Sequence, residues 1–181
     1  MRLVATEYLT LDGVFAEPGH WSFPYFNEQA AKFKSDELEA TEALLLGRKT
    51  YEGFAAAWPT MEGTGEFGVR MNTMPKYVVS STLESPEWNN STVLKGDAVN
   101  EVSKLKQELD GRIVVPGSIQ LVRALLGHDL VDELRLLVFP IVLGAGERLF
   151  GETSDKKPMR LVETQSGDDV AFLAYEPVRD S

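Results

Sequence analysis

The 181-residue sequence contains no cysteine, which excludes disulfides, thiolate nucleophiles and cysteine-ligated zinc or iron–sulfur sites. Its two histidines, His20 and His128, are far apart in the sequence, so we expect no metal site. Apolar runs never reach the roughly 18 residues needed to span a bilayer. The first 13 residues also lack the apolar core of a signal peptide. We therefore expect a cytoplasmic protein that does not bind membranes.

Positive charge is scarce, because 18 Lys and Arg against 28 Asp and Glu give a net charge of −10. The acidic excess falls in both halves of the chain and would repel a nucleic-acid backbone, so no nucleic-acid partner is expected. Any phosphate group that the protein binds must be held by a local arrangement of backbone N–H groups and basic side chains. The length fits a single domain over residues 1–181.

Segments rich in β-formers alternate with segments of helical period, which predicts an α/β fold. The expected strands are residues 2–11, 43–46, 76–80, 112–115 and 131–142, and the expected helices are residues 27–41, 48–57, 97–110 and 119–126. Asn27 is the expected N-cap of the first helix. The glycine-rich stretch 63–68 is expected to be a loop. Residues 160–177 are expected to form two strands joined near Gly167 and Asp168.

The expected strand 43–46 leads directly into a helix through Gly47, Arg48, Lys49 and Thr50. A helix N-terminus presents unpaired N–H groups and about half a positive charge, which favours phosphate binding. Here two basic side chains and a hydroxyl add to that effect. The junction is either an anion site of this kind or only a tight turn between strand and helix.

A second junction, Pro116-Gly117-Ser118, follows the expected strand 112–115 and opens the next helix. Gly117 permits a close approach of the backbone to a ligand, and Ser118 can cap the helix or bind. Ser80 and Ser81 end another buried strand, at the edge where open α/β sheets receive ligands. Both features also fit ordinary turns and strand ends.

Aromatic residues gather around Pro24, where Trp21, Phe23, Tyr25 and Phe26 occur within six positions. Such a cluster is either core packing or the wall of a pocket for a flat heterocycle. Farther upstream, the Asp12-Gly13 dipeptide is either a hairpin turn or part of a loop over a site.

The order of several short motifs resembles the dihydrofolate-reductase-like superfamily. These motifs are Thr10–Gly13, Leu46–Glu52, Lys76–Leu83, Gly117-Ser118, Leu130–Leu134 and Pro140–Gly146. Together they are most similar to the reductase domain that closes the bifunctional deaminase-reductase of riboflavin biosynthesis. Without a deaminase domain, the chain resembles the stand-alone members of that group.

This resemblance implies a three-layer α-β-α fold with a central mixed, mostly parallel sheet and a C-terminal antiparallel hairpin. It also implies NADPH as cofactor. Carried over to this chain, the cofactor-binding residues are Gly47, Arg48, Lys49, Thr50, Ser80, Ser81, Gly117 and Ser118. Among them, Arg48 is expected near the 2′-phosphate. The resemblance further implies a homodimer, to which the apolar strand 136–142 is expected to contribute.

The resulting hypothesis is an NADPH-dependent reductase that transfers a hydride to a small heterocyclic or sugar-derived substrate. The activity would resemble 5-amino-6-(5-phosphoribosylamino)uracil reductase. Trp21 and Phe26 are expected to line the substrate pocket, and Asp12 and Glu28 are the candidate catalytic proton or hydrogen-bond partners. Two alternatives remain open at this point: a pyridine-nucleotide-binding module without turnover, and a structural or interaction protein.

Overall fold

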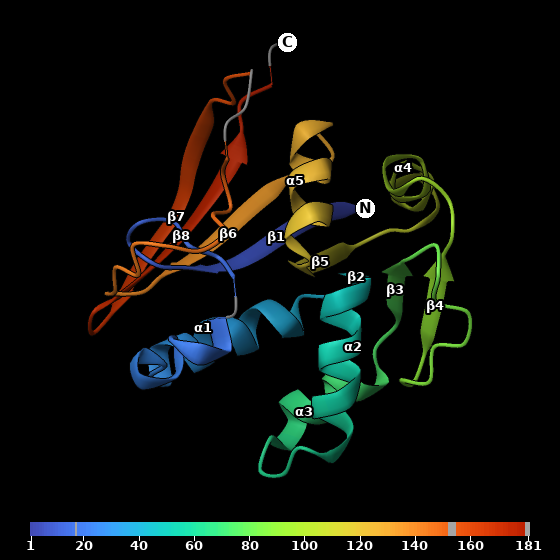
Figure 1. Cartoon of the computed structure of the whole chain (residues 1–181), viewed down its shortest axis with the longest axis horizontal. Coiled ribbons are helices and arrows are strands. Elements are labelled where there is room, and N and C mark those ends of the chain that lie inside the picture. The colour runs from blue at the N-terminus through green and yellow to red at the C-terminus, as the bar shows by residue number, and fades with distance from the viewer. Residues whose placement is uncertain (17, 152–154, 180–181) are drawn as a thin grey trace.

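The computed structural model describes residues 1–16, 18–151 and 155–179, which form an eight-stranded β-sheet between layers of helices (Figure 1). The strands are β1 (Arg2–Leu9), β2 (Ala43–Gly47), β3 (Lys76–Val79), β4 (Ser91–Leu94), β5 (Arg112–Gly117), β6 (Glu133–Val138), β7 (Met159–Gly167) and β8 (Val170–Pro177). The α-helices are α1 (Glu28–Glu39), α2 (Arg48–Ala57), α3 (Gly65–Thr73), α4 (Ala98–Glu108) and α5 (Ile119–Gly127). Short 3-10 turns occur at Pro18–His20, Phe23–Tyr25 and Trp58–Thr60.

The strands lie in the order β4-β3-β2-β5-β1-β6-β8-β7. From β4 to β6 every neighbouring pair is parallel, whereas β8 runs antiparallel to both β6 and β7. Gly167 pairs with Val170, so the β7–β8 hairpin turns at Asp168, whose φ of 51° an aspartate tolerates. The predicted mixed, mostly parallel sheet with a C-terminal antiparallel hairpin is confirmed.

Apolar clusters on the two faces of the sheet hold three layers together. On one face, α4 and α5 bury Leu105 and Leu121 against the central strands. On the other face, Tyr51 of α2 packs over β2. Phe33 of α1 stacks there on Phe172 of β8, with ring centroids 5.0 Å apart. The predicted α-β-α layering is therefore confirmed.

The chain leaves two neighbouring strands, β2 and β5, toward opposite faces of the sheet. After β2 it enters α2 on the face of Tyr51, and after β5 it enters α5 on the face of Leu121. Both helices therefore begin at the same edge, outside the carboxyl ends of the strands (Figure 1). In open α/β sheets this divergence creates the crevice in which ligands bind.

The expectation that residues 63–68 form a loop is wrong, because α3 begins at Gly65. The glycines belong to the turn that enters this helix, since Gly63 and Gly65 both have positive φ angles. The remainder of the stretch is helical because α3 buries Met71 against the sheet. Strand β4 was not anticipated, and its partly exposed residues form one edge of the sheet.

The strand expected over residues 131–142 is shorter, because β6 spans only Glu133–Val138. Its last residue, Val138, pairs with Leu9, where β1 also ends, and Pro140 has no N–H to continue a ladder. None of the helices among the described residues is long and apolar enough to cross a membrane.

Candidate functional site

The two predicted anion-binding junctions lie against each other at the carboxyl edge of the sheet. A Cβ added to Gly47 would lie 2.3 Å from the Ser118 hydroxyl oxygen and 2.8 Å from the Ser118 backbone nitrogen. A Cβ on Gly117 would lie 2.6 Å from Thr50 Oγ1. Because no side chain fits at either position, glycine brings the two helix N-termini into contact.

Both helix N-termini at this edge begin without a side-chain cap. Gly47 is the N-cap of α2 and has no side chain, and the Ser118 hydroxyl makes no capping hydrogen bond to α5. The first N–H groups of each helix therefore have no cap from their own N-cap side chain, and the helix dipoles add partial positive charge. This arrangement is suited to an anion.

The basic and hydroxyl side chains predicted to bind the cofactor surround this edge. Arg48 and Lys49 are exposed, and within the described part of the chain Arg48 makes only a long ion pair of 3.8 Å with Glu52. Ser80 is buried, and its hydroxyl accepts hydrogen bonds from the backbone N–H groups of the turn that follows β3. Ser81 is exposed beside it. Ser80 therefore shapes the turn, while Arg48, Lys49 and Ser81 remain accessible to a ligand.

Pro116 lies in β5, not in the turn where the sequence placed it. The register between β2 and β5 shifts here, because Val114 pairs with Leu44 while Gly117 pairs with Leu46. A strand position without an N–H is tolerated at such a bulge. The chain turns from β5 into α5 at Gly117, with a φ of 152°, and at the cis peptide bond between Gly117 and Ser118. We call this turn, which lies against Gly47, the β2–β5 corner. Pro116 therefore lies before this turn, and Gly117 adopts the backbone angles that the turn requires.

Asp12 lies in the loop after β1 and holds that loop in place. Its carboxylate accepts hydrogen bonds from the Thr10 hydroxyl and from the N–H groups of Leu143 and Gly144 at 3.3 and 2.8 Å. Arg148 donates to the Asp12 carbonyl oxygen at 2.9 Å. The hydrogen bond from the Thr10 hydroxyl, followed by those from the Gly144 and Leu143 N–H groups, lowers the pKa of Asp12 to about 2. Asp12 is therefore ionised at neutral pH, which suits anchoring better than proton donation.

The aromatic cluster divides between the core and the surface. Trp21 is 7% exposed, packs edge-on against Phe139, and donates from Nε1 to the Ala16 carbonyl oxygen. Phe26 is 41% exposed and lies near Tyr8, with ring centroids 6.4 Å apart. Trp21 therefore belongs to the core, whereas Phe26 is accessible to a ligand.

A hollow of about 590 Å³ lies beside Phe26 at the start of α1. It is lined by Phe26, Asn27, Glu28, Gln29, Ala31 and Asp168. Glu28 is exposed, so its carboxylate faces water. The structure thus brings Phe26 and Glu28 to one hollow but places Trp21 outside its lining and Asp12 on a different loop.

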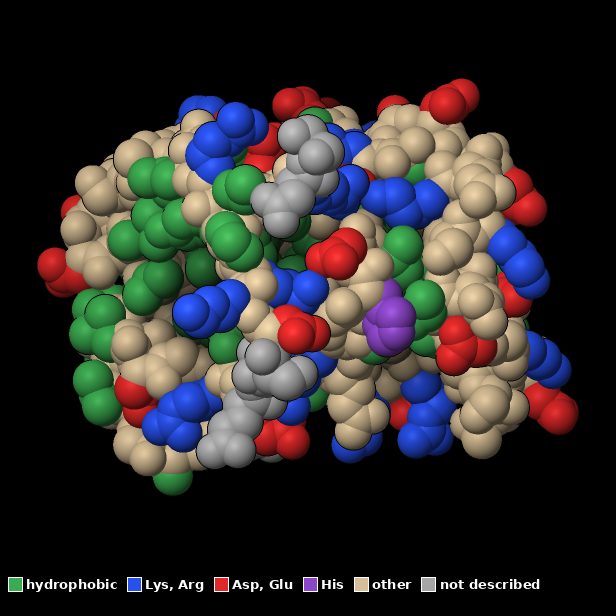
Figure 2. Space-filling model, turned by 90° about the horizontal axis from the view of Figure 1, so that it is seen from above, with side chains coloured by type: hydrophobic (Ala, Val, Ile, Leu, Met, Phe, Trp, Pro, Cys, Tyr) green, Lys and Arg blue, Asp and Glu red, His purple; other side chains and the backbone are tan. Residues whose placement is uncertain are grey.

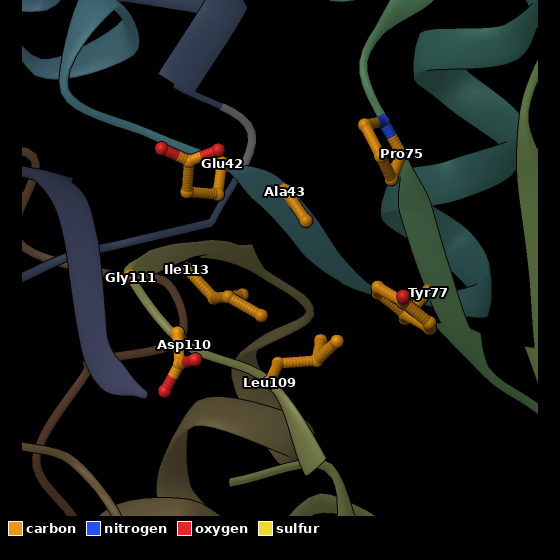
Figure 3. A pocket seen from close by; sticks show the side chains of 8 residues that line it. All are labelled: Glu42, Ala43, Pro75, Tyr77, Leu109, Asp110, Gly111 and Ile113. Carbon is orange, nitrogen blue, oxygen red and sulfur yellow. The ribbon is translucent and has the colours of Figure 1, made fainter.

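A second hollow of about 340 Å³ lies at the opposite edge of the sheet, near the amino ends of β2 and β5 (Figure 3). Its lining includes the acidic residues Glu42 and Asp110 around an apolar floor that contains Ile113. None of the residues predicted to bind a cofactor or substrate lines it. The helix N-termini at the carboxyl edge, not this hollow, therefore form the candidate site.

Sequence reasoning missed the polar groups buried around β1. On the face of α1, the Glu37 carboxylate accepts hydrogen bonds from Thr6, Lys34 and Arg135. On the other face, Glu7 is 1% exposed. The signal was present in the sequence, since Thr6 and Glu7 are polar residues that follow the apolar run Leu3–Ala5 within the strand.

Sequence comparison relates the chain to a known protein family. Residues 2–172 match a family model described as the RibD C-terminal domain. The uncharacterized protein YwjB of Bacillus subtilis (strain 168) is 28% identical over 169 residues, which cover 92% of each chain.

Two solved structures with low sequence identity have the same fold. A putative riboflavin biosynthesis protein from Shewanella sp. PV-4 matches with a TM-score of 0.79 at 22% identity, over 99% of this chain and 100% of that one. Dihydrofolate reductase from Enterococcus faecalis, complexed with NADP(H), matches with a TM-score of 0.65 at 17% identity, over 97% and 96%. The dihydrofolate-reductase-like fold is thereby established.

Proposed function

The chain belongs to the RibD C-terminal domain family, and from this premise we propose that it is an NADPH-dependent reductase. Family membership supports a reductase-type role. The observation that carries the cofactor assignment is the meeting of two uncapped helix N-termini at the β2–β5 edge, beside Arg48 and Lys49. In a protein of net charge −10, this local arrangement provides what a dinucleotide phosphate requires.

The residues present fit such a cofactor. Gly47 and Gly117 let the two junctions pack together, with the Ser118 and Thr50 hydroxyls in the space that a side chain would fill. The N–H groups that open α2 and α5, together with these two hydroxyls, would then bind phosphate oxygens at one place. Arg48 and Lys49 would neutralise phosphate charge, with Arg48 assigned to the 2′-phosphate, and Ser81 would contact the adenosine ribose. When bound, the nicotinamide supplies a hydride to an electrophilic carbon of the substrate.

The substrate would occupy the hollow beside α1. Phe26 offers an aromatic face to a flat heterocycle, and Glu28 offers a carboxylate that can accept hydrogen bonds from ring or exocyclic N–H groups. Asp12 would act indirectly, by holding the loop after β1 to the segment that contains Gly144. A heterocyclic or sugar-derived substrate fits this combination.

Calorimetric titration of the purified protein with NADPH and NADH tests the cofactor assignment. We expect micromolar binding of NADPH and at least tenfold weaker binding of NADH, because only NADPH carries the 2′-phosphate. Equal affinity for the two would remove the role of Arg48. If neither bound, the proposed function would be wrong.

One observation favours a binding module without turnover as the second candidate function. Asp12 is ionised and Glu28 is exposed, so neither provides a shielded proton donor. This alternative predicts NADPH binding without NADPH oxidation in a panel of pterin, pyrimidine and ketone substrates. Loss of the NADPH absorbance that depends on an added substrate would exclude the binding module without turnover.

We also propose that the protein forms a homodimer. Part of the strand predicted for the interface is covered by the chain itself, since Leu137 and Phe139 are fully buried, whereas Val142 at its end is 65% exposed. Hydrophobic side chains instead gather on the side where β7 and β8 lie (Figure 2). Leu161 and Val162 of β7 are 48% and 44% exposed. Light scattering during gel filtration should show a dimer, and Leu161→Lys should shift it toward monomer.

A further inference from the structure

Glu7 differs from the other buried carboxylates among the described residues. Both oxygens of Glu37 and both oxygens of Glu133 accept hydrogen bonds from neighbouring side chains. Glu7 is 1% exposed, yet its Oε1 has no hydrogen-bond partner. Leaving a buried polar atom unpaired costs free energy, so a purely structural role would favour an apolar residue at this position.

The position of Glu7 in the sheet connects it to the candidate cofactor site. The pairing of β1 with β5 ends at Ala5 and Val115, while β1 continues along β6 as far as Leu9. Beyond Val115, β5 pairs only with β2, through Gly117. Glu7 therefore lies where β1 and β5 part, one strand away from the corner that would hold the phosphates.

A dinucleotide with its phosphates at the β2–β5 corner can extend along the carboxyl edge in two directions. Ser81, after β3, lies on one side of this corner, and β1 lies on the other. Because the proposed function places the adenosine ribose at Ser81, the nicotinamide end must extend toward β1. Glu7 is the buried polar residue on β1 whose side chain retains an unpaired atom.

Burial favours the neutral form of the Glu7 carboxyl. Desolvation raises the pKa of Glu7 well above its ordinary value, and the field of Glu37 raises it further, while Lys34 of α1 opposes both. Along the sheet, Ala5, Leu9 and Leu136 are its uncharged neighbours on the same face. A protonated carboxyl presents one hydrogen-bond donor and one acceptor side by side.

We propose that the Glu7 carboxyl recognises the carboxamide group of the nicotinamide ring by a pair of complementary hydrogen bonds. A primary carboxamide also presents one donor and one acceptor side by side, so the two groups match atom for atom. The cofactor would thereby satisfy the unpaired Oε1. This inference rests on the proposed function and adds to it a residue that fixes the orientation of the reactive ring.

The test compares Glu7→Leu and Glu7→Gln in calorimetric titrations with three probes. NADPH carries the carboxamide, its 3-acetylpyridine analogue replaces the amino group with methyl, and 2′,5′-ADP lacks the nicotinamide altogether. Glu7→Leu should weaken NADPH about tenfold, the effect of losing a hydrogen bond, and leave 2′,5′-ADP unchanged. Glu7→Gln should bind NADPH as the wild type does, because an amide retains both the donor and the acceptor.

The acetylpyridine analogue gives a second measurement that needs no variant. Wild type should bind it several-fold more weakly than NADPH, and this difference should disappear in Glu7→Leu. Leu125→Ala is the matched control, because it removes a fully buried side chain from the same face without touching a polar group. It should lower the melting temperature and leave the preference for NADPH over the analogue intact.

The outcomes separate the two proposals. If wild type binds NADPH and 2′,5′-ADP but Glu7→Leu binds NADPH equally well, the assignment of Glu7 is overturned and the proposed function stands. The assignment also fails if wild type does not distinguish NADPH from the acetylpyridine analogue. If wild type binds none of the probes, both the proposed cofactor and the ligand assigned to Glu7 are wrong.

Discussion

The N-termini of α1 and α4 differ from those of α2 and α5 in whether a side chain accepts a hydrogen bond from their backbone N–H groups. Asn27 caps α1 by accepting a hydrogen bond from the Ala30 N–H at 2.8 Å, and Asp97 caps α4 by accepting one from the Asn100 N–H at 3.0 Å. The helices α2 and α5 begin at residues whose side chains make no capping hydrogen bond.

This difference distinguishes helix ends that are closed from helix ends that are open to a ligand. A capping side chain satisfies the backbone donors and stabilises the helix by about 1 kcal/mol, but it occupies the place that an anion would take. The helix α3 also begins without a side-chain cap, but among the helices that the structure describes it is α2 and α5 that converge, through Gly47 and Gly117. In this protein the candidate site is therefore the place where two uncapped N-termini meet.

The largest expected effect comes from capping one of the open ends. Ser118→Asp places a carboxylate at the N-cap of α5, where it can accept from the helix N–H groups and repel phosphate. NADPH affinity should fall about 100-fold or more, since a charge-assisted hydrogen bond of about 1.5–3 kcal/mol is lost and like-charge repulsion is added. Calorimetry with NADPH measures this loss.

The same variant should melt at the wild-type temperature or higher, because aspartate is a favourable N-cap. Weaker binding together with a stable fold is the result that supports an anion site at α5. Unchanged NADPH affinity would show that the α5 N-terminus holds no phosphate.

A smaller effect is expected from Arg48→Ala. Arg48 is about half exposed, and its long ion pair with Glu52 contributes little, so its removal should leave the fold stable. NADPH binding should weaken by roughly 1.5–3 kcal/mol, the value of a charge-assisted contact to the 2′-phosphate, and NADH binding should not change. Titrations with both cofactors at one ionic strength measure the difference. An equal loss for both would assign Arg48 to another phosphate group.

The smallest effect is expected at a closed end. Asp97→Ala removes the cap of α4 and should lower the free energy of unfolding by about 0.5–1 kcal/mol. NADPH affinity should remain that of the wild type, because α4 has no part in the β2–β5 edge. Urea denaturation and calorimetry on the same sample provide both numbers. A loss of NADPH binding in this variant would remove the distinction between closed and open helix ends.

The sequence predicted those features of the site that depend on local order along the chain. Gly47 and Thr50 lie at one passage from a buried strand to a helix, Gly117 and Ser118 lie at the other, and the structure brings these four residues together. Arg48, Lys49 and Ser81 are accessible near the same edge, although their contacts with a cofactor stay predictions.

Other parts of the candidate site depended on contacts between distant segments. Trp21 is a core residue because Phe139 packs against it, and Asp12 is an anchor because Gly144 and Arg148 reach it from beyond β6. Neither contact has a local signal in the sequence. The burial of Glu7 likewise follows from the position of β1 in the middle of the sheet.

Local sequence patterns were sufficient to predict the α/β class, the Asn27 cap of α1, the helix α4 and the two glycine-containing junctions, because these depend on periodicity, capping and turn chemistry between near neighbours. Only the tertiary structure decided that the two junctions meet, that Pro116 lies in a bulge, and that β1 parts from β5 beside Glu7. Strand order decides these features. It arises from packing between segments far apart in the chain, which local residue patterns do not encode.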